Sequence, residues 1–193
     1  MTGTAEFTTE RLRMRRYRTD DAPLLYEGFG RDPQMTAYSD WNPYATREMA
    51  EETVRRFIGS YDDPGFYGWA VEHQGQLIGT VGAYDYDAER NQIEIGISIA
   101  RAFWGKGFAT EALSGVLRYL TAHEGIGTVT AWCAAENTGS MKAMTKAGMK
   151  QTAVVKGGLD VDGKTYDKLV FRYPADHAEQ RGIHSCSVHE TGE

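Results

Sequence analysis

The sequence predicts a mixed α/β fold in which helices flank a central, mostly antiparallel sheet. The expected order of elements is strand, two helices, three strands, helix, strand, helix and two strands. Short turns at 74–75 and 88–91 join neighbouring strands, and strands joined so tightly run antiparallel. A helix separates the strand at 91–100 from the strand at 128–134, so these two strands are expected to be parallel. Such a sheet is mixed and differs from a fully parallel, doubly wound one.

The first elements are a strand and two helices. Residues 11–17, RLRMRRY, place Leu12, Met14 and Arg16 at alternate positions, which is typical of a strand. The segment 20–23, DDAP, begins a short helix, and Thr46 caps a second helix. The second helix repeats side chains at helical spacing: Met49, Thr53, Val54, Phe57, Ile58 and Tyr61.

The remaining elements are predicted from the alternation typical of strands and the spacing typical of helices. Strands are expected at 66–73, 76–86 and 91–100, and the last places four isoleucines on one face: Ile93, Ile95, Ile97 and Ile99. A helix then turns an apolar face inward: Ala112, Leu113, Val116, Leu117 and Leu120. A strand at 128–134, a helix at 138–147 that ends at Gly148, and two strands at about 151–161 and 165–173 complete the order. Asp162-Gly163 is a good turn between the last two.

Length and composition indicate one folded domain and a polar tail. The chain has 193 residues, of which 41% are hydrophobic and 25% charged, which suffices for a sizeable core. We expect the domain at 8–173 and the tail at 174–193. Two cysteines give no disulfide framework, and no apolar run suits a signal peptide or a membrane span, so we expect a cytoplasmic protein. Monomer and homodimer both stay open. The net charge of −6 argues against nucleic-acid binding and fits a cationic partner.

The stretch FWGKGFATEAL, residues 103–113, places Gly105, Gly107 and Ala109 at every second position just before a helix. The first turn of a helix has N–H groups without intrahelical partners, and glycines let an anion approach them closely. A tight turn without a ligand is the alternative. The stretch is neither a P-loop nor a dinucleotide fingerprint, because the Lys-Ser/Thr pair and the longer glycine spacing are missing.

Three segments together resemble the GNAT acetyltransferases, in particular the branch of the ribosomal-protein N-terminal acetyltransferases RimJ and RimL. They are TTERLRMRRYRTDDAPLLYEGF (8–29), the strand IEIGISI with the glycine stretch after it, and AENTGSMKAMTKAGM (135–149). The resemblance covers about residues 8 to 173 in order. It implies a GNAT-like sheet and an acetyl-CoA-dependent N-acetyltransferase.

The resemblance also implies an acetyl-CoA site. The backbone N–H groups from Gly105 to Thr110 would hold the diphosphate, the backbone of Ile97, Ser98 and Ile99 would pair with the pantetheine arm, and Asn137 would bind its amides. Trp104 stands where the general family pattern has Gln or Arg, although Trp is familiar in this branch. The residues of the diphosphate loop are Trp104, Gly105, Lys106, Gly107, Phe108, Ala109 and Thr110.

Two side chains are candidates for proton transfer. Glu94 lies on the polar side of the isoleucine strand, where a carboxylate can take a proton from an ammonium group; a solvated surface carboxylate is the alternative. Ser140 matches the family serine that is proposed to protonate the leaving thiolate, and a helix cap is its alternative. Cys133, on an apolar strand, is interpreted as a core residue rather than a nucleophile.

Aromatic residues between the first two helices are candidates for an acceptor pocket: Tyr38, Trp41 and Tyr44, with Tyr67 and Trp69 beside them. Core packing is the alternative, and the sequence does not separate the two. The tail segment HSCSVHE has metal-ligand residue types without an established zinc spacing, so we expect no metal.

The resulting hypothesis is acetyl transfer to a primary amine, which we expect to be a protein or peptide N-terminus. A polyamine or antibiotic acetyltransferase and a non-catalytic acyl-CoA-binding module are the alternatives, because acceptor loops vary independently of the fold.

Overall fold

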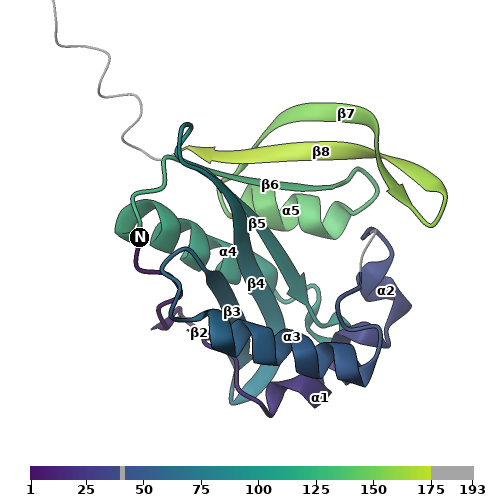
Figure 1. Ribbon diagram of the computed structural model, residues 1–193. Helices are drawn as coiled ribbons and strands as arrows, with labels where there is room; N and C mark the ends of the chain where they lie inside the picture. The colour runs from purple at the N-terminus through teal and green to yellow at the C-terminus, as the bar shows by residue number, and fades with distance from the viewer. Residues whose placement is uncertain (40–41, 175–193) are drawn as a thin grey trace, which may run out of the picture.

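The computed structural model describes residues 1–39 and 42–174, which form an open eight-stranded sheet with helices on both faces (Figure 1). The strand order is β1-β2-β3-β4-β5-β6-β8-β7. Neighbouring strands run antiparallel except β5 and β6, which run parallel. The fold class expected from the sequence is therefore confirmed.

The elements have the following bounds. The strands are β1 (Phe7–Thr8), β2 (Arg13–Arg15), β3 (Tyr67–His73), β4 (Gln76–Asp87), β5 (Gln92–Ile99), β6 (Thr128–Ala134), β7 (Lys150–Val161) and β8 (Lys164–Pro174). The α-helices are α1 (Asp21–Leu25), α2 (Pro33–Thr36), α3 (Arg47–Ser60), α4 (Phe108–Arg118) and α5 (Thr138–Lys146). Two π-helical turns, η1 (Tyr26–Gly30) and η3 (Tyr119–His123), extend α1 and α4, and a short 3-10 turn, η2 (Arg101–Phe103), follows β5.

The sheet separates two apolar layers. The larger layer packs α4 and α5 against the isoleucine face of β5, and it includes Ile93, Ile95 and Leu113. The second layer packs α1, η1 and α3 against the other face, through Leu25 and Val54 among others. Figure 1 shows α1 and α3 in front of β2 to β4 and α4 behind them. Alternate residues of β5 therefore face different layers.

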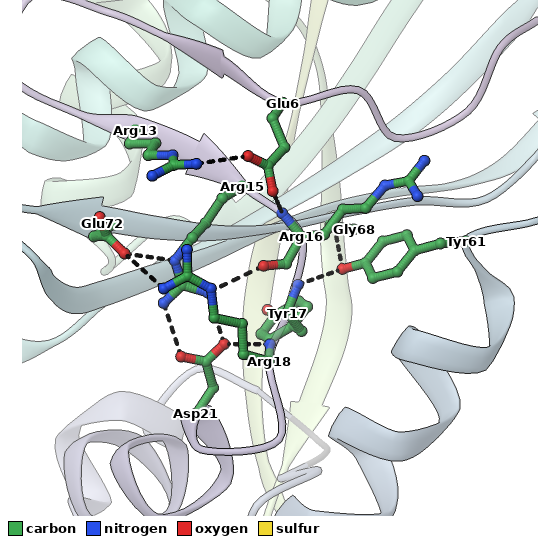
Figure 2. Close-up of polar contacts among 10 residues, drawn as sticks. All are labelled: Glu6, Arg13, Arg15, Arg16, Tyr17, Arg18, Asp21, Tyr61, Gly68 and Glu72. Atoms are coloured by element: carbon green, nitrogen blue, oxygen red, sulfur yellow. Dashed lines mark hydrogen bonds and ion pairs between the residues drawn. The ribbon is translucent and has the colours of Figure 1, made fainter.

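A buried ion network fastens α1 to the sheet (Figure 2). The guanidinium of Arg15 makes two hydrogen bonds of 2.8 Å to Asp21 at the start of α1 and one of 2.6 Å to Glu72 on β3. The side chains of Arg15 and Asp21 are each only 3% exposed. These hydrogen bonds, of which those to Asp21 contribute most, raise the pKa of Arg15 although burial opposes its charge. The pairing fixes α1 on the sheet face that also carries Glu94.

The structure confirms one expected helix start and extends the last expected strand. The expected helix start at Thr46 is confirmed, since its hydroxyl accepts a hydrogen bond from the N–H of Met49. The last strand runs to Pro174, one residue beyond the expected end, and residues 175–193 lie outside the described residues. No helix within 1–39 and 42–174 is long and apolar enough to cross a membrane.

Candidate active site

The central feature of the site is an opening in the sheet between β5 and β6. The two strands pair only where Gln92–Glu94 meet Thr128–Thr130. Beyond these residues β5 continues to Ile99 beside β4, and β6 continues to Ala134 beside β8. Figure 1 shows the two strands starting together and then moving apart. The facing edges are therefore unpaired strands, which can bind an extended ligand through the backbone.

Hydrogen-bond alternation decides which groups of β5 face the opening. The N–H of Ala100 donates to Ile78 on β4, so the even-numbered residues of β5 direct their backbone groups to β4. Ile97 and Ile99 then direct theirs to the opening, whereas the backbone of Ser98 faces β4. The indole N–H of Trp104 donates to the carbonyl of Ile99 at 2.5 Å, which occupies that acceptor.

The loop before α4 presents unpaired backbone donors. Gly105 and Gly107 have φ of +74° and +82°, values that residues other than glycine rarely adopt. Gly107 is also the N-cap of α4. The N–H groups from Gly105 to Thr110 have no acceptor within the described residues. A Cβ at Gly105 would meet no atom within 4 Å, so the space beside this residue is open. These features fit an anion such as a diphosphate.

The charge of Lys106 is directed away from this loop. Its ammonium donates to the carbonyl of Ala102 at 3.0 Å and lies 5.3 Å from the ring of Phe103. The donors of the loop are therefore backbone N–H groups.

Glu94 lies on the face of β5 opposite the isoleucines, between two aromatic side chains. The indole N–H of Trp132 on β6 donates to Oε1 of Glu94 at 2.8 Å. Tyr84 stands directly opposite Glu94 on β4, and burial, the charge of Glu94 and a hydrogen bond to Glu94 raise the pKa of Tyr84. The hydroxyl of Tyr84 passes over Gly96, where a Cβ would come within 3.0 Å of it.

Sequence reasoning did not select Tyr84 or Trp132. Tyr84 becomes visible once β4 and β5 are aligned at their turn, because it then pairs with Glu94. Trp132 lies 38 residues from Glu94 in the sequence and becomes its neighbour through the parallel pairing of β5 and β6.

The start of α5 brings Asn137, Ser140 and Cys133 together. The cap of the helix is Asn137, whose Oδ1 accepts from the N–H of Ser140 at 3.1 Å, so the helix-cap alternative for Ser140 is wrong. The Ser140 side chain instead forms a hydrogen bond with the thiol of Cys133 on β6. This hydrogen bond lowers the pKa of Cys133, whereas burial raises it by more. Burial raises the pKa of Cys133 to about 11, which keeps it a thiol at neutral pH.

The candidate pocket aromatics separate into different environments. Tyr38 is half-buried and packs edge-on against Tyr166 with ring centroids 5.6 Å apart, in a small cluster that includes Trp132. Tyr44 is buried, and its hydroxyl bonds those of Tyr17 and Thr80, so it packs the interior. Trp41 lies outside the described residues.

Tyr67 and Trp69 belong to the larger apolar core. They are 2% and 0% exposed, so the packing alternative holds for both.

A surface groove lies beside α5, and Met141, the residue after Ser140, is part of its lining. It has a volume of about 570 Å³ and is lined by α5, the start of β7 and Phe171, and the lining includes Lys142, Lys146 and Lys150. None of the site residues expected from the sequence lines it.

The comparison with known proteins assigns the class. Residues 11–150 match the model of the acetyltransferase (GNAT) domain. The chain belongs to the GNAT acetyltransferase family, a family of N-acetyltransferase enzymes, and the expected resemblance is confirmed.

The individual relatives share only a low sequence identity with this chain. The uncharacterized N-acetyltransferase p20 of Bacillus licheniformis is 26% identical over 165 residues, which are 84% of this chain and 92% of that protein. The ribosomal-protein α-N-acetyltransferase RimL in complex with coenzyme A superposes with a TM-score of 0.80 at 15% identity, over 89% of this chain and 99% of RimL. The microcin self-immunity acetyltransferase MccE, in complex with acetyl-CoA and AMP, gives 0.75 at 14% identity, over 86% and 93%.

Proposed function

We propose that this protein transfers the acetyl group of acetyl-CoA directly to a primary amine in a ternary complex. The observation that carries the proposal is the opening between β5 and β6 next to a loop with unpaired N–H groups. An extended arm can pair with the edge of β5 while its diphosphate binds at the start of α4. The RimL and MccE structures, which hold CoA or acetyl-CoA on the same fold, support this choice of cosubstrate.

The binding roles follow from the described geometry. The N–H groups of Gly105 to Thr110 would hold the diphosphate. The N–H and C=O of Ile97 and the N–H of Ile99 would pair with the pantetheine arm, and this narrows the expectation that included Ser98. The Oδ1 of Asn137 caps α5, so its Nδ2 is the group that would donate to a pantetheine amide.

The proposed chemistry needs two proton transfers. Acetyl-CoA supplies an activated thioester, and the acceptor must be a neutral amine before its nitrogen can form the new C–N bond. Glu94 would take the proton of the ammonium group, directly or through a water, held in position by Trp132 and Tyr84. Ser140 would donate a proton to the sulfur as the C–S bond breaks, so that a thiol leaves, and the proton that the nitrogen loses as the amide forms would restore the Ser140 hydroxyl.

The proposed acceptor is a protein or peptide N-terminus. The name of RimL supports it, and the carboxylate of Glu94, bonded to Trp132 of the cluster that also holds half-buried Tyr38, suits a cationic amine. The small-molecule alternative is retained because MccE, named for self-immunity to microcin, has the same fold.

The test is a thiol-release assay with acetyl-CoA across N-terminal peptides, polyamines and amine antibiotics. The proposal predicts turnover with at least one peptide, and lower turnover with polyamines and amine antibiotics than with that peptide. A reversed order selects the small-molecule function. Binding of acetyl-CoA with no release of thiol for any amine indicates a non-catalytic module.

A further inference from the structure

Arg11 connects the N-terminal segment to the start of α4. It lies between β1 and β2, and its Nε forms an ion pair of 2.7 Å with Oε2 of Glu111 in the first turn of α4. The backbone N–H of Arg11 also donates to Oε1 of Glu111 at 2.7 Å, and the hydroxyl of Thr9 donates to the same oxygen at 2.5 Å. Residues 100 positions apart in the sequence thus form one unit.

The same guanidinium contacts the glycine loop itself. Its Nη1 donates to the carbonyl of Lys106 at 3.0 Å, and its central carbon lies 4.5 Å from the ring centroid of Phe108. Its Nη2 lies 3.4 Å from the position that a Cβ on Gly107 would take. Lys106 and Phe108 therefore contact one side chain, and Gly107 lies between them in the sequence.

The hydrogen bond to Lys106 sets the direction of a loop donor. The peptide unit is planar and trans, so the N–H of Gly107 points opposite to the C=O of Lys106. Because Arg11 holds that carbonyl, the N–H of Gly107 is directed away from the guanidinium. Gly107 on its C-terminal side makes this peptide easy to reorient, so an external restraint matters here more than in a regular helix.

The ion pair also changes the charge near the loop. Burial opposes ionisation of Glu111, but the hydrogen bonds from Thr9 and Arg11 outweigh it and lower its pKa. An ionised carboxylate in the first turn would repel a diphosphate at the same helix end. The guanidinium of Arg11 neutralises this charge.

We propose that Arg11 is a positioning residue of the diphosphate site. Its guanidinium holds the Lys106–Gly107 peptide in its anion-binding orientation and neutralises Glu111. This inference rests on the proposed function. It gives the N-terminal TTER segment and the TEAL segment of α4 one shared role in binding the cosubstrate.

The test compares Arg11→Gln and Arg11→Lys with Arg13→Gln, which removes an equal charge and an exposed ion pair to Glu6 away from the loop. Calorimetric titration with CoA should show affinity reduced about 10-fold for Arg11→Gln, because a charge-assisted contact is lost. Arg11→Lys should recover only the part of the affinity that depends on neutralising Glu111, since an ammonium cannot hold Lys106 and Glu111 in a fork. Arg13→Gln should bind as the wild type does.

A second donor separates positioning from general damage. S-acetyl-N-acetylcysteamine carries the thioester without a diphosphate, so its KM should be equal in wild type and Arg11→Gln, whereas KM for acetyl-CoA rises and kcat stays unchanged. Equal CoA affinity in wild type and Arg11→Gln, or full recovery in Arg11→Lys, would overturn the inference and leave the proposed function intact. Failure of the wild type to bind CoA would overturn both. If Arg11→Gln does not fold, Arg11→Lys supplies the decisive comparison.

Discussion

At the scale of single residues, the setting of Glu94 is the most informative. Its carboxylate accepts a hydrogen bond from Trp132 and neighbours Tyr84, so its orientation is fixed from two strands. A solvated surface carboxylate would lack such restraint. The arrangement supports the role of proton acceptor, because a base must be held within reach of the proton it removes.

Replacing Glu94 by Gln tests that role. Glu94→Gln preserves size and a hydrogen-bond acceptor for Trp132, so acetyl-CoA affinity should not change. Turnover at neutral pH should fall about 10²–10⁴-fold, the usual cost of losing a general base. The deficit should shrink as pH rises towards the pKa of the amine, because more acceptor is then neutral. A variant with wild-type kcat from pH 6 to 10 would show that Glu94 is structural.

Ser140 is tested in a similar way. Ser140→Ala should lower kcat about 10²-fold, while the Kd for acetyl-CoA stays near the wild-type value, because the donor acts as the sulfur gains charge. The melting temperature should change little, since Asn137 caps α5. Thr145→Ala, which removes another hydroxyl from the same helix, is the matched control. A large loss of melting temperature without a change in kcat would contradict the proposed role.

Residue-level prediction from the sequence succeeded where one strand carried the pattern. Alternation alone placed Glu94 opposite the isoleucines, and the structure confirms that Ile93 and Ile95 are buried in the core. It failed where the partner came from another element. Trp132 and Arg11 reach their partners through pairings set by the whole sheet, and no local periodicity records them.

At the scale of elements, the N-terminal helices depend on the network around Arg15. Its two hydrogen bonds to Asp21 hold α1 on the sheet, and Tyr61 at the end of α3 accepts from the N–H of Tyr17 and donates to the carbonyl of Gly68 (Figure 2). Of the helices that cover the Glu94 face, α1 is thereby fastened at its start and α3 at its end.

Asp21→Asn should be strongly destabilising. The substitution leaves the guanidinium of Arg15 buried with one charged partner fewer, and breaking such a pair costs about 3 kcal/mol in the free energy of unfolding. For a chain of this size the melting temperature should fall by roughly 6–12 °C. Asp20→Asn is the control, because Asp20 is exposed and makes no capping hydrogen bond. Equal melting temperatures for the two variants would show that the network contributes little to stability.

Element boundaries were predictable where capping residues marked them. Thr46 and Gly148 bound α3 and α5 as expected, through a hydroxyl cap and a φ of +95°. The π-helical turns η1 and η3 carry no such signal, because continued apolar spacing resembles an α-helix.

At the scale of the whole molecule, short turns and one crossover sufficed to predict a mixed sheet. The position of β8 between β6 and β7 was not predictable from the hairpin alone, since either strand could meet β6. Packing decides it: β8 buries Tyr166, Leu169 and Phe171, whereas β7 is exposed over most of its length. The opening between β5 and β6 likewise arises from pairing that stops after three residues.

The central claim is that CoA binds in this opening with its diphosphate on the loop before α4, and a backbone-amide NMR titration with CoA tests it most directly. The account predicts that the largest shifts occur at Gly105 to Thr110 and at Ile97 and Ile99. Residues that line the groove between α5 and β7, such as Lys146 and Gln151, should shift little. Saturable shifts confined to that groove, with the amides of Gly105 to Thr110 unchanged, would contradict the account.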